Sequence, residues 1–246
     1  MSAADSEVLL DARGLGRALG PAGGVRDLTL SLRAGDVLGL LGLNGAGKTT
    51  ALRLLAGTLA PDAGTVSIAG HSLEDEPLAA RARLGYLPDV PPLYPELRVG
   101  EHLALAARLR RLPRAAVGPA VERVLECCDL GAVRDRRVAT LSKGYRQRVG
   151  LAQALVHDPA VLLLDEPGSG LDPRQTEQLR ELVTESAPTR ATVFSTHLLH
   201  EARSVCNRVA VVHDGRLVAE HAAEGDALEA LFADLARGAP TAERAA

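Results

Sequence analysis

The sequence has no apolar run that approaches the roughly 18 residues of a membrane-spanning helix. Its start, Met1-Ser2-Ala3-Ala4-Asp5, has neither the basic nor the apolar region of a secretory signal peptide. We therefore expect a protein that stays in the cytoplasm. The net charge of −3 is not the basic balance that is typical of nucleic-acid-binding proteins, so we expect no nucleic-acid partner.

Cysteine is scarce and repeats are absent. The three cysteines, Cys127, Cys128 and Cys206, contain no C-x-x-C pair and are odd in number, which argues against a disulfide framework or a zinc site. We interpret them as packing residues. The chain of 246 residues, with 46% hydrophobic and 24% charged residues, has the composition of a globular protein with one domain and space for an inserted subdomain.

One segment matches the phosphate-binding pattern G-x-x-x-x-G-K-[ST], the P-loop: Gly42, Leu43, Asn44, Gly45, Ala46, Gly47, Lys48, Thr49 and Thr50. An apolar run, 37–41, precedes it and helix-forming residues, 50–56, follow, so we predict a buried strand, a loop and a helix. The glycines allow backbone N–H groups to surround phosphate oxygens at the helix start. Lys48 would neutralise the outer phosphates, and Thr49 could bind Mg²⁺. A simple turn would explain the glycines but not Lys48-Thr49.

Two more runs place polar side chains where parallel strands end. The apolar run 161–164 ends in Asp165-Glu166, and the predicted strand 191–194 leads to His197. Open α/β sheets bind ligands at the carboxyl ends of their strands. Two adjacent carboxylates there need a cation, which Mg²⁺ bound to phosphate would supply. A lone histidine is usually structural, but the position of His197 favours a place in the same site.

The remaining patterns describe the rest of the fold. Strand-like runs at 8–11, 28–32 and 65–69 predict a small antiparallel sheet, and 209–213 with 216–219 predicts a hairpin. Four prolines indicate a stiff extended connector over 85–95. We predict helices over 100–112 and 114–130, a helix over 143–156 capped by Ser142, and a last helix that includes 228–235. A basic cluster, Arg108, Arg110, Arg111 and Arg114, is interpreted as a solvated helix face.

Together these motifs resemble the ATP-binding subunit of ABC transporters. The P-loop, Leu141-Ser142-Lys143-Gly144-Tyr145, Asp165-Glu166, Asp172 and His197 follow the family's order, from about residue 8 to 235. Residues 42–44 and 85–89 are most similar to the ABC-2 subgroup, which includes gliding-motility and drug-export ATPases. The resemblance implies an α/β fold: a P-loop NTPase (RecA-like) core with a mainly parallel sheet, an antiparallel β subdomain and an inserted helical subdomain. The core would comprise 8–87 and 158–237, the helical subdomain 96–157, and a frayed tail 238–246.

The resemblance also implies roles for the site residues. Two subunits, expected to be identical, would dimerise head to tail, with each ATP between the P-loop of one chain and Ser142 and Gly144 of the other. Asp165 would hold Mg²⁺ and Glu166 would act as general base. His197 would contact the γ-phosphate, and Asp172 would link the two sites. These residues would position and stabilise charge, as phosphoryl transfer requires.

Four positions depart from the family pattern. Leu19 stands where an aromatic residue usually stacks on adenine, so we expect weak selectivity for the base. Asp89 replaces a glutamine that senses Mg²⁺ and the attacking water, and an ionised aspartate accepts hydrogen bonds but cannot donate them. Lys143 and Tyr145 replace the glycine and glutamine of the usual Leu-Ser-Gly-Gly-Gln.

The expected function is that of an ATPase that drives an ABC-2-type exporter through a separate membrane permease. The permease would bind in a groove near residues 86–100. The subunit would then be attached to the inner face of the cell membrane through that permease. One alternative is a soluble ABC ATPase that acts on ribosomes or DNA, although the chain lacks the second nucleotide domain typical of that class. A regulatory module without hydrolysis is a further alternative, which Glu166 and His197 disfavour. A GTPase would need an Asn-Lys-x-Asp guanine reader, which the sequence lacks.

Overall fold

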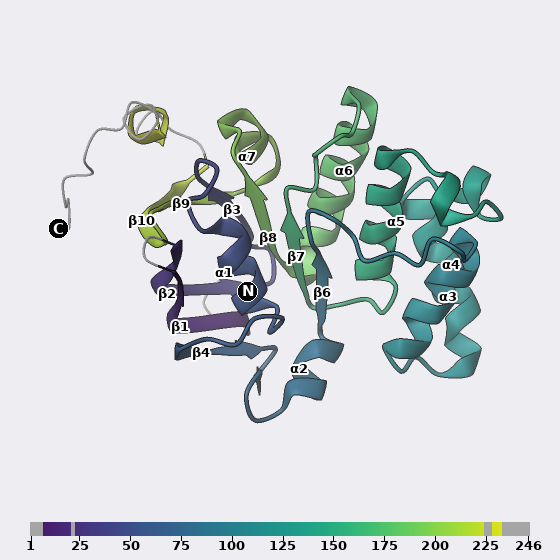
Figure 1. The fold of residues 1–246 in the computed structure, drawn as a ribbon, viewed down its shortest axis with the longest axis horizontal. Helices are drawn as coiled ribbons and strands as arrows, with labels where there is room; N and C mark the ends of the chain where they lie inside the picture. The colour runs from purple at the N-terminus through teal and green to yellow at the C-terminus, as the bar shows by residue number, and fades with distance from the viewer. Residues whose placement is uncertain (1–6, 21–22, 224–227, 233–246) are drawn as a thin grey trace.

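The computed structural model describes residues 7–20, 23–223 and 228–232, and within these the chain forms two β-sheets and a group of helices (Figure 1). The larger sheet has the strand order β10-β9-β3-β8-β7-β6. Its strands are β3 (Val37–Leu41), β6 (Leu84–Leu87), β7 (Val161–Asp165), β8 (Ala191–Thr196), β9 (Arg208–His213) and β10 (Arg216–Ala222). All neighbouring pairs are parallel except β9 and β10, which form the expected hairpin at one edge.

The central strands are apolar on both faces because each face packs on a different layer. Along β7, Leu162 and Leu164 join the cluster formed with the helices, whereas Val161 and Leu163 join the cluster formed with the smaller sheet. This alternation follows from the two-residue period of a strand. A strand covered on both sides reads as a continuous hydrophobic run, which is what residues 161–164 show.

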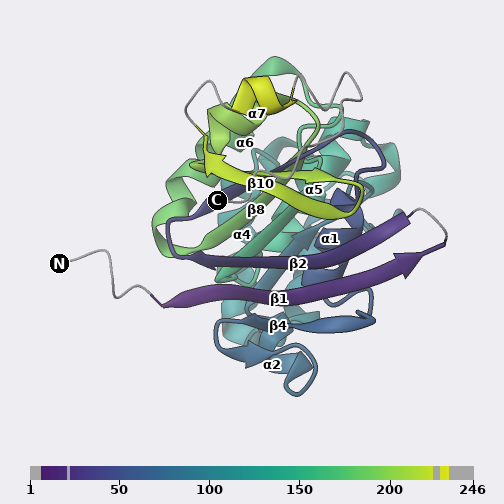
Figure 2. The same cartoon turned by 90° about the vertical axis from the view of Figure 1, so that its left-hand side faces the viewer.

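The smaller sheet is antiparallel and has the order β2-β1-β4-β5 (Figure 2). Its strands are β1 (Val8–Leu19), β2 (Gly23–Arg33), β4 (Ala63–Ile68) and β5 (His71–Ser72). Helix α1 (Lys48–Leu55) buries Leu52 and Leu55 in the same cluster as side chains of both sheets. The antiparallel subdomain is therefore packed against the nucleotide-binding segment, as the sequence predicted.

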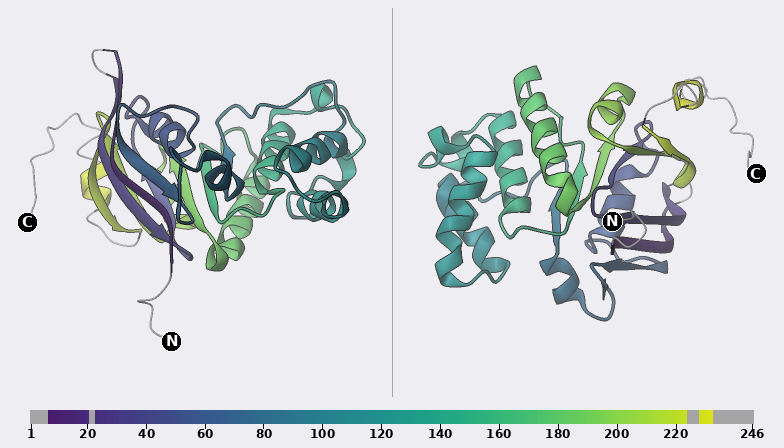
Figure 3. Two further views of the ribbon diagram at one scale, coloured as in Figure 1. Left: turned by 90° about the horizontal axis from the view of Figure 1, so that it is seen from below. Right: turned by 180° about the vertical axis from the view of Figure 1, so that it is seen from behind.

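The helices α3 (Val99–Leu109), α4 (Arg114–Cys127) and α5 (Lys143–Leu155) lie at the opposite end of the molecule from the antiparallel sheet (Figure 3). We propose residues 96–157 as a helical subdomain inserted between core segments 8–87 and 158–237. The other helices are α2 (Pro77–Ala82), α6 (Pro173–Ser186) and α7 (Leu199–Val205), and short 3-10 turns occupy Gly131–Val133, Val138–Thr140 and Ala187–Thr189. Among the described residues, no helix combines the length and the hydrophobicity needed to cross a bilayer.

Several predicted boundaries were wrong. The first part of the predicted connector, residues 85–87, belongs to strand β6 (Leu84–Leu87), because the leucines of this strand are buried beside β7. The helix expected over 100–112 ends at Leu109, before Arg111 with φ +61°, and the helix expected over 114–130 ends at Cys127, before Asp129 with φ +49°. Such positive φ angles do not fit a right-handed helix.

Two other expectations are resolved only in part. Cys128 and Cys206 are buried, but Cys127 is exposed, so the packing interpretation was wrong for Cys127. The last predicted helix is present over 228–232, and its continuation to 235 and the tail 238–246 lie outside the described residues.

Candidate functional site

The P-loop connects the end of β3 to the start of α1, as the sequence predicted. Gly45 and Gly47 have φ angles of +84° and +107°, in the left-handed region that favours glycine. A Cβ atom on Gly42 would lie only 2.5 Å from the carbonyl oxygen of Val212. These glycines allow a tight loop whose backbone N–H groups, at the positive end of α1, can bind an anion such as phosphate.

Lys48 is nearly buried and is held within this loop. Its Nζ donates to the carbonyl oxygen of Gly42 at 2.8 Å and lies 3.4 Å from Oε1 of Glu166. The loop's own carbonyl groups therefore aim the ammonium group at the space that the loop encloses. A phosphate in that space would meet a cation whose position is already fixed, which favours binding because little side-chain freedom is lost.

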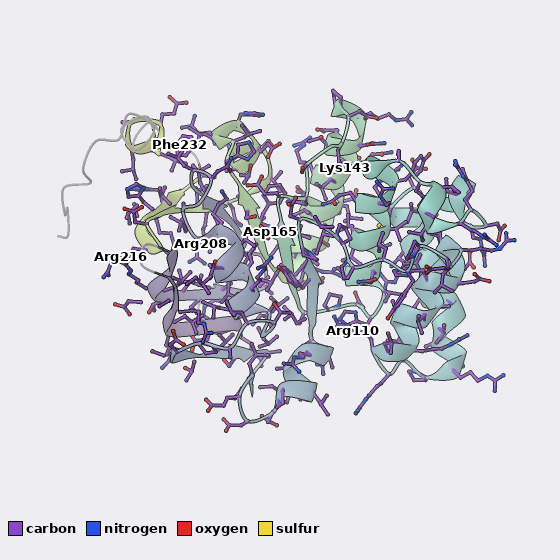
Figure 4. All side chains as sticks on the ribbon, viewed as in Figure 1. Arg110, Lys143, Asp165, Arg208, Arg216 and Phe232 are labelled. Carbon is purple, nitrogen blue, oxygen red and sulfur yellow. The ribbon has the colours of Figure 1, made fainter. Side chains whose placement is uncertain are left out.

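Asp165 is fully buried at the end of β7 (Figure 4). Its Oδ1 accepts hydrogen bonds from Ser195 Oγ at 2.9 Å and from Thr49 Oγ1 at 3.2 Å, whereas Oδ2 has no hydrogen-bond partner among the described residues. Burial raises the pKa of this carboxyl group, and the nearby charges of Asp89 and Glu166 add to the rise, although the two hydrogen bonds oppose it. The buried carboxylate of Asp165 therefore lacks a compensating positive charge within the described part of the chain.

A magnesium ion fits this deficit. The unpartnered oxygen of Asp165 and the hydroxyl group of Thr49 are both hard oxygen donors, which Mg²⁺ prefers. The described residues contain no cluster of three or more His, Cys, Asp or Glu side chains that could hold a metal ion. Mg²⁺ usually keeps several waters and binds through one or two protein oxygens and the phosphates. Asp89 lines the same cleft. We propose that it lies near the ion.

Glu166 lies between two groups that can donate hydrogen bonds to it. Its Oε2 is 3.0 Å from Nδ1 of His197, and its Oε1 faces Lys48. The residue has a φ angle of +46°, which is uncommon outside glycine, and its backbone N–H donates to Ser195 Oγ at 3.0 Å. The chain thus fixes this carboxylate at the edge of the sheet, where it could accept a proton from a water molecule.

The P-loop, Glu166 and His197 border one cleft of 480 Å³. Of the predicted site residues, the cleft collects Asn44, Gly45, Ala46, Gly47, Lys48, Thr49, Thr50, Asp89, Glu166 and His197. Gly42, Leu43 and Asp165 are not among the lining residues, but Gly42 and Leu43 belong to the loop and Asp165 lies beneath it, bonded to Thr49. Ser142, Gly144 and Asp172 also do not line this cleft. One chain therefore assembles only part of the predicted site.

Ser142 and Asp172 begin helices instead. Ser142 Oγ accepts from the N–H of Tyr145 at 3.4 Å, at the start of α5, and Asp172 Oδ1 accepts from the N–H of Gln175 at 2.9 Å, at the start of α6. Both are N-caps, which satisfy otherwise unpaired N–H groups. The sequence predicted the first cap but not the second.

Two serines at the site were not predicted from the sequence. Ser195 connects Asp165 to the backbone of Glu166, and Ser169 lines the cleft beside Glu166. A signal for Ser195 was present, because it is a polar residue near the end of a buried strand, two residues before the predicted His197. Ser169 lies in the loop 166–170, where the sequence shows no periodicity that could have placed it.

Comparisons with known proteins agree with this geometry. The sequence profile of the family described as "ABC transporter" matches residues 25–169. A relative from Paraburkholderia xenovorans, "Nod factor export ATP-binding protein I", is 41% identical over 80% of this chain and 66% of its own length. A protein of the same name from Burkholderia lata is 39% identical over 87% of this chain and 70% of its own length. The chain thus spans about two thirds of the length of these relatives.

A solved structure described as "Structure of ATP binding subunit of ABC transporter" superposes with a TM-score of 0.83 at 32% sequence identity. The match covers 93% of this chain and 99% of the other. The shared fold is that of the P-loop NTPases, as the sequence motifs predicted. From the matched profile, the relatives and the P-loop cleft, we conclude that the chain belongs to the ABC transporter family and is an ATP-binding ATPase domain of that family.

Proposed function

We propose that the chain is the ATP-hydrolysing subunit that energises an ABC-2-type exporter through a separately encoded membrane permease. The main support is that Glu166 is held between Lys48 and His197 at the mouth of the P-loop cleft. This is the arrangement expected of a site that hydrolyses its nucleotide. The export role is supported by the two relatives named for Nod factor export, which share about two fifths of the aligned residues.

Hydrolysis follows from the positions of the chain's own groups. The P-loop N–H groups and Lys48 hold the phosphates of ATP, and Thr49 and Asp165 would hold Mg²⁺, which neutralises phosphate charge when bound. Lys48 would pair with the γ-phosphate from its fixed position, so its charge would no longer be taken up by Glu166 alone, and Glu166 can accept the proton of the attacking water. His197, bonded to Glu166, keeps the carboxylate in place and can reach the same phosphate.

The incomplete cleft supports a dimer of two such chains. Ser142 and Gly144 do not line the chain's own cleft, yet α5 begins at these residues with a capped, positively polarised end. We propose that this end contacts the γ-phosphate bound by the second copy, and that Asp172 helps to connect the two sites. The second copy would therefore complete each site, so hydrolysis should depend on protein concentration.

The permease would bind near residues 86–100. Val90 and Tyr94 in this segment are large hydrophobic residues with 79% and 52% of their surface exposed. The proposal is tested by co-expressing the chain with a candidate permease, a multi-span membrane protein of the ABC-2 kind, and purifying through a tag on that protein. We expect the two to copurify and the ATPase rate to rise in the complex. A chain that never associates with a membrane protein, and whose ATPase activity alone is already maximal, would refute the transport role.

The cleft also predicts weak selectivity for the base. Leu19, 46% exposed, lines the cleft where the family usually has an aromatic ring. We expect ATP and GTP to be hydrolysed with similar kcat/KM. The Leu19→Tyr variant should bind ATP more tightly by about 1 kcal/mol, or roughly fivefold, because a ring can stack on adenine. Competition binding with both nucleotides measures this, and strict ATP preference of the unmodified chain would contradict it.

A further inference from the structure

The starts of α5 and α6 approach each other at two glycines. A Cβ atom on Gly144 would lie 2.8 Å from Oε1 of Gln175, and one on Gly170 would lie 2.8 Å from Cδ of Lys143. Gly170 also has a φ angle of +79°, which favours glycine. The first turn of α5 therefore packs directly against the loop 168–172 that leads into α6.

Lys143 makes a polar contact between the start of α5 and the loop that leads into α6. Its aliphatic stem passes over Gly170, and its Nζ donates to Ser169 Oγ at 3.0 Å. Ser169 in turn lines the P-loop cleft, and its backbone N–H donates to the carbonyl oxygen of Glu166 at 3.0 Å. A continuous chain of contacts thus joins the start of α5 to the carboxylate residue of the chain's own cleft.

We propose that Lys143 is a positioning residue that couples the two nucleotide sites of the dimer. Its bond to Ser169 ties the start of α5 to the loop that borders the chain's own cleft. When this loop moves, the start of α5 and the neighbouring Ser142 move with it. This inference rests on the proposed function, in which Ser142 contacts the nucleotide of the second copy. Nucleotide in one cleft then influences the position of Ser142 at the other.

The chemistry of lysine suits this role. A glycine at this position, as in the usual family sequence, has no side chain and could not reach Ser169. Lys143 provides a long stem and three donors, so it can span the gap over Gly170 and keep a bond to a hydroxyl group as the loops move. Ser142 and Lys143 are exposed in the single chain, where water competes for the bond. A dimer interface would exclude that water and strengthen the bond.

Hydrogen–deuterium exchange tests the coupling without requiring hydrolysis. ADP with Mg²⁺ is added to the full chain, and exchange is followed in peptides that cover 141–147 and 166–172. We expect ADP to slow exchange in both peptides of the unmodified chain. Lys143→Met keeps the stem but removes the donor. In this variant, ADP should still slow exchange in peptide 166–172 but should no longer slow it in peptide 141–147. Lys143→Arg, which keeps a donor, should retain both effects.

Steady-state kinetics provide the second readout. Lys143→Met should lower kcat by about three- to tenfold, the effect of one lost hydrogen bond, and reduce the Hill coefficient for ATP toward 1. Its affinity for ADP should stay within twofold and its melting temperature should be unchanged. Lys143→Arg should recover most of the kcat. Adding Ser169→Ala to Lys143→Met should cause less loss than the sum of the single changes, because both remove one contact.

The outcomes separate this inference from the proposed function. The coupling role is overturned if Lys143→Met still transmits slowed exchange to 141–147, or if ADP never affects that peptide in the unmodified chain. If the exchange results hold but the unmodified chain, alone and with its permease, hydrolyses no ATP, the proposed function fails and the contact between α5 and the cleft stands.

Discussion

Glu166→Gln is expected to bind ATP normally and to release phosphate roughly 10² to 10⁴ times more slowly, the range for loss of a general base. Glutamine has almost the same shape, so the contact with His197 and the turn at φ +46° should survive. The amide cannot accept a proton from water, however. ATP should then remain bound, and the variant should accumulate as an ATP-bound dimer on size-exclusion chromatography with Mg²⁺.

Glu177→Gln is a matched control for this change. Glu177 lies on α6, is exposed and pairs with Arg180 on the same helix, away from the P-loop cleft. Its replacement removes the same charge from the chain and should alter the rate by less than about twofold, because exposed ion pairs contribute little. Unchanged phosphate release from Glu166→Gln would remove Glu166 from the role of base.

The residues that bind phosphate were predictable because their chemistry is local. The motif from Gly42 to Thr49, with the apolar run before it and the helix formers after it, predicts a strand, a loop and a helix, and the structure places all three there. Likewise, the apolar run before Asp165 fits a strand covered on both faces, and the structure places β7 there. These patterns are short-range, so one sequence is sufficient to read them.

Contacts between distant segments were not predictable in the same way. The link from Ser195 to Asp165 joins residues 30 positions apart, and that from Lys143 to Ser169 joins residues 26 apart. The position of Ser195 near a strand end does not identify its partner, and Ser169 does not differ locally from the many surface serines of a globular protein. α6 was also missed, because only Leu179 and Val183 are buried in it and most of its surface is polar. Such elements are positioned by tertiary packing rather than by a sequence period.

Asp165→Asn should make the nucleotide-free protein more stable at neutral pH while abolishing its response to Mg²⁺. Asp165 is fully buried and its Oδ2 has no partner among the described residues, so the ionised form carries an uncompensated charge. Asparagine keeps an oxygen for the hydroxyl groups of Ser195 and Thr49 without that charge. We expect a gain on the order of 1 kcal/mol, or about 2–4 °C in melting temperature.

The pH dependence of this gain identifies its cause. Burial raises the pKa of Asp165 in the folded state above the usual 3.8, so the folded chain binds a proton more readily than the unfolded chain. As the pH falls from neutral toward 3.8, the carboxyl group becomes protonated in the folded protein and its cost disappears. The advantage of Asp165→Asn should therefore shrink over this range, as followed by thermal unfolding at a series of pH values without nucleotide.

The same carboxylate is costly without the ion and required with it. In the unmodified chain, Mg²⁺ with ATP should raise the melting temperature more than ATP with a chelator, because the ion neutralises Asp165. In Asp165→Asn that difference should vanish, and phosphate release should fall roughly 10²-fold or more, since the ion is worth several kcal/mol to the transition state. A variant that is less stable than the unmodified chain at neutral pH, yet still responds to Mg²⁺, would show that Asp165 is a structural residue and not a ligand. The pairing of a stability gain with a loss of catalysis is expected only if burial of this charge serves the metal ion.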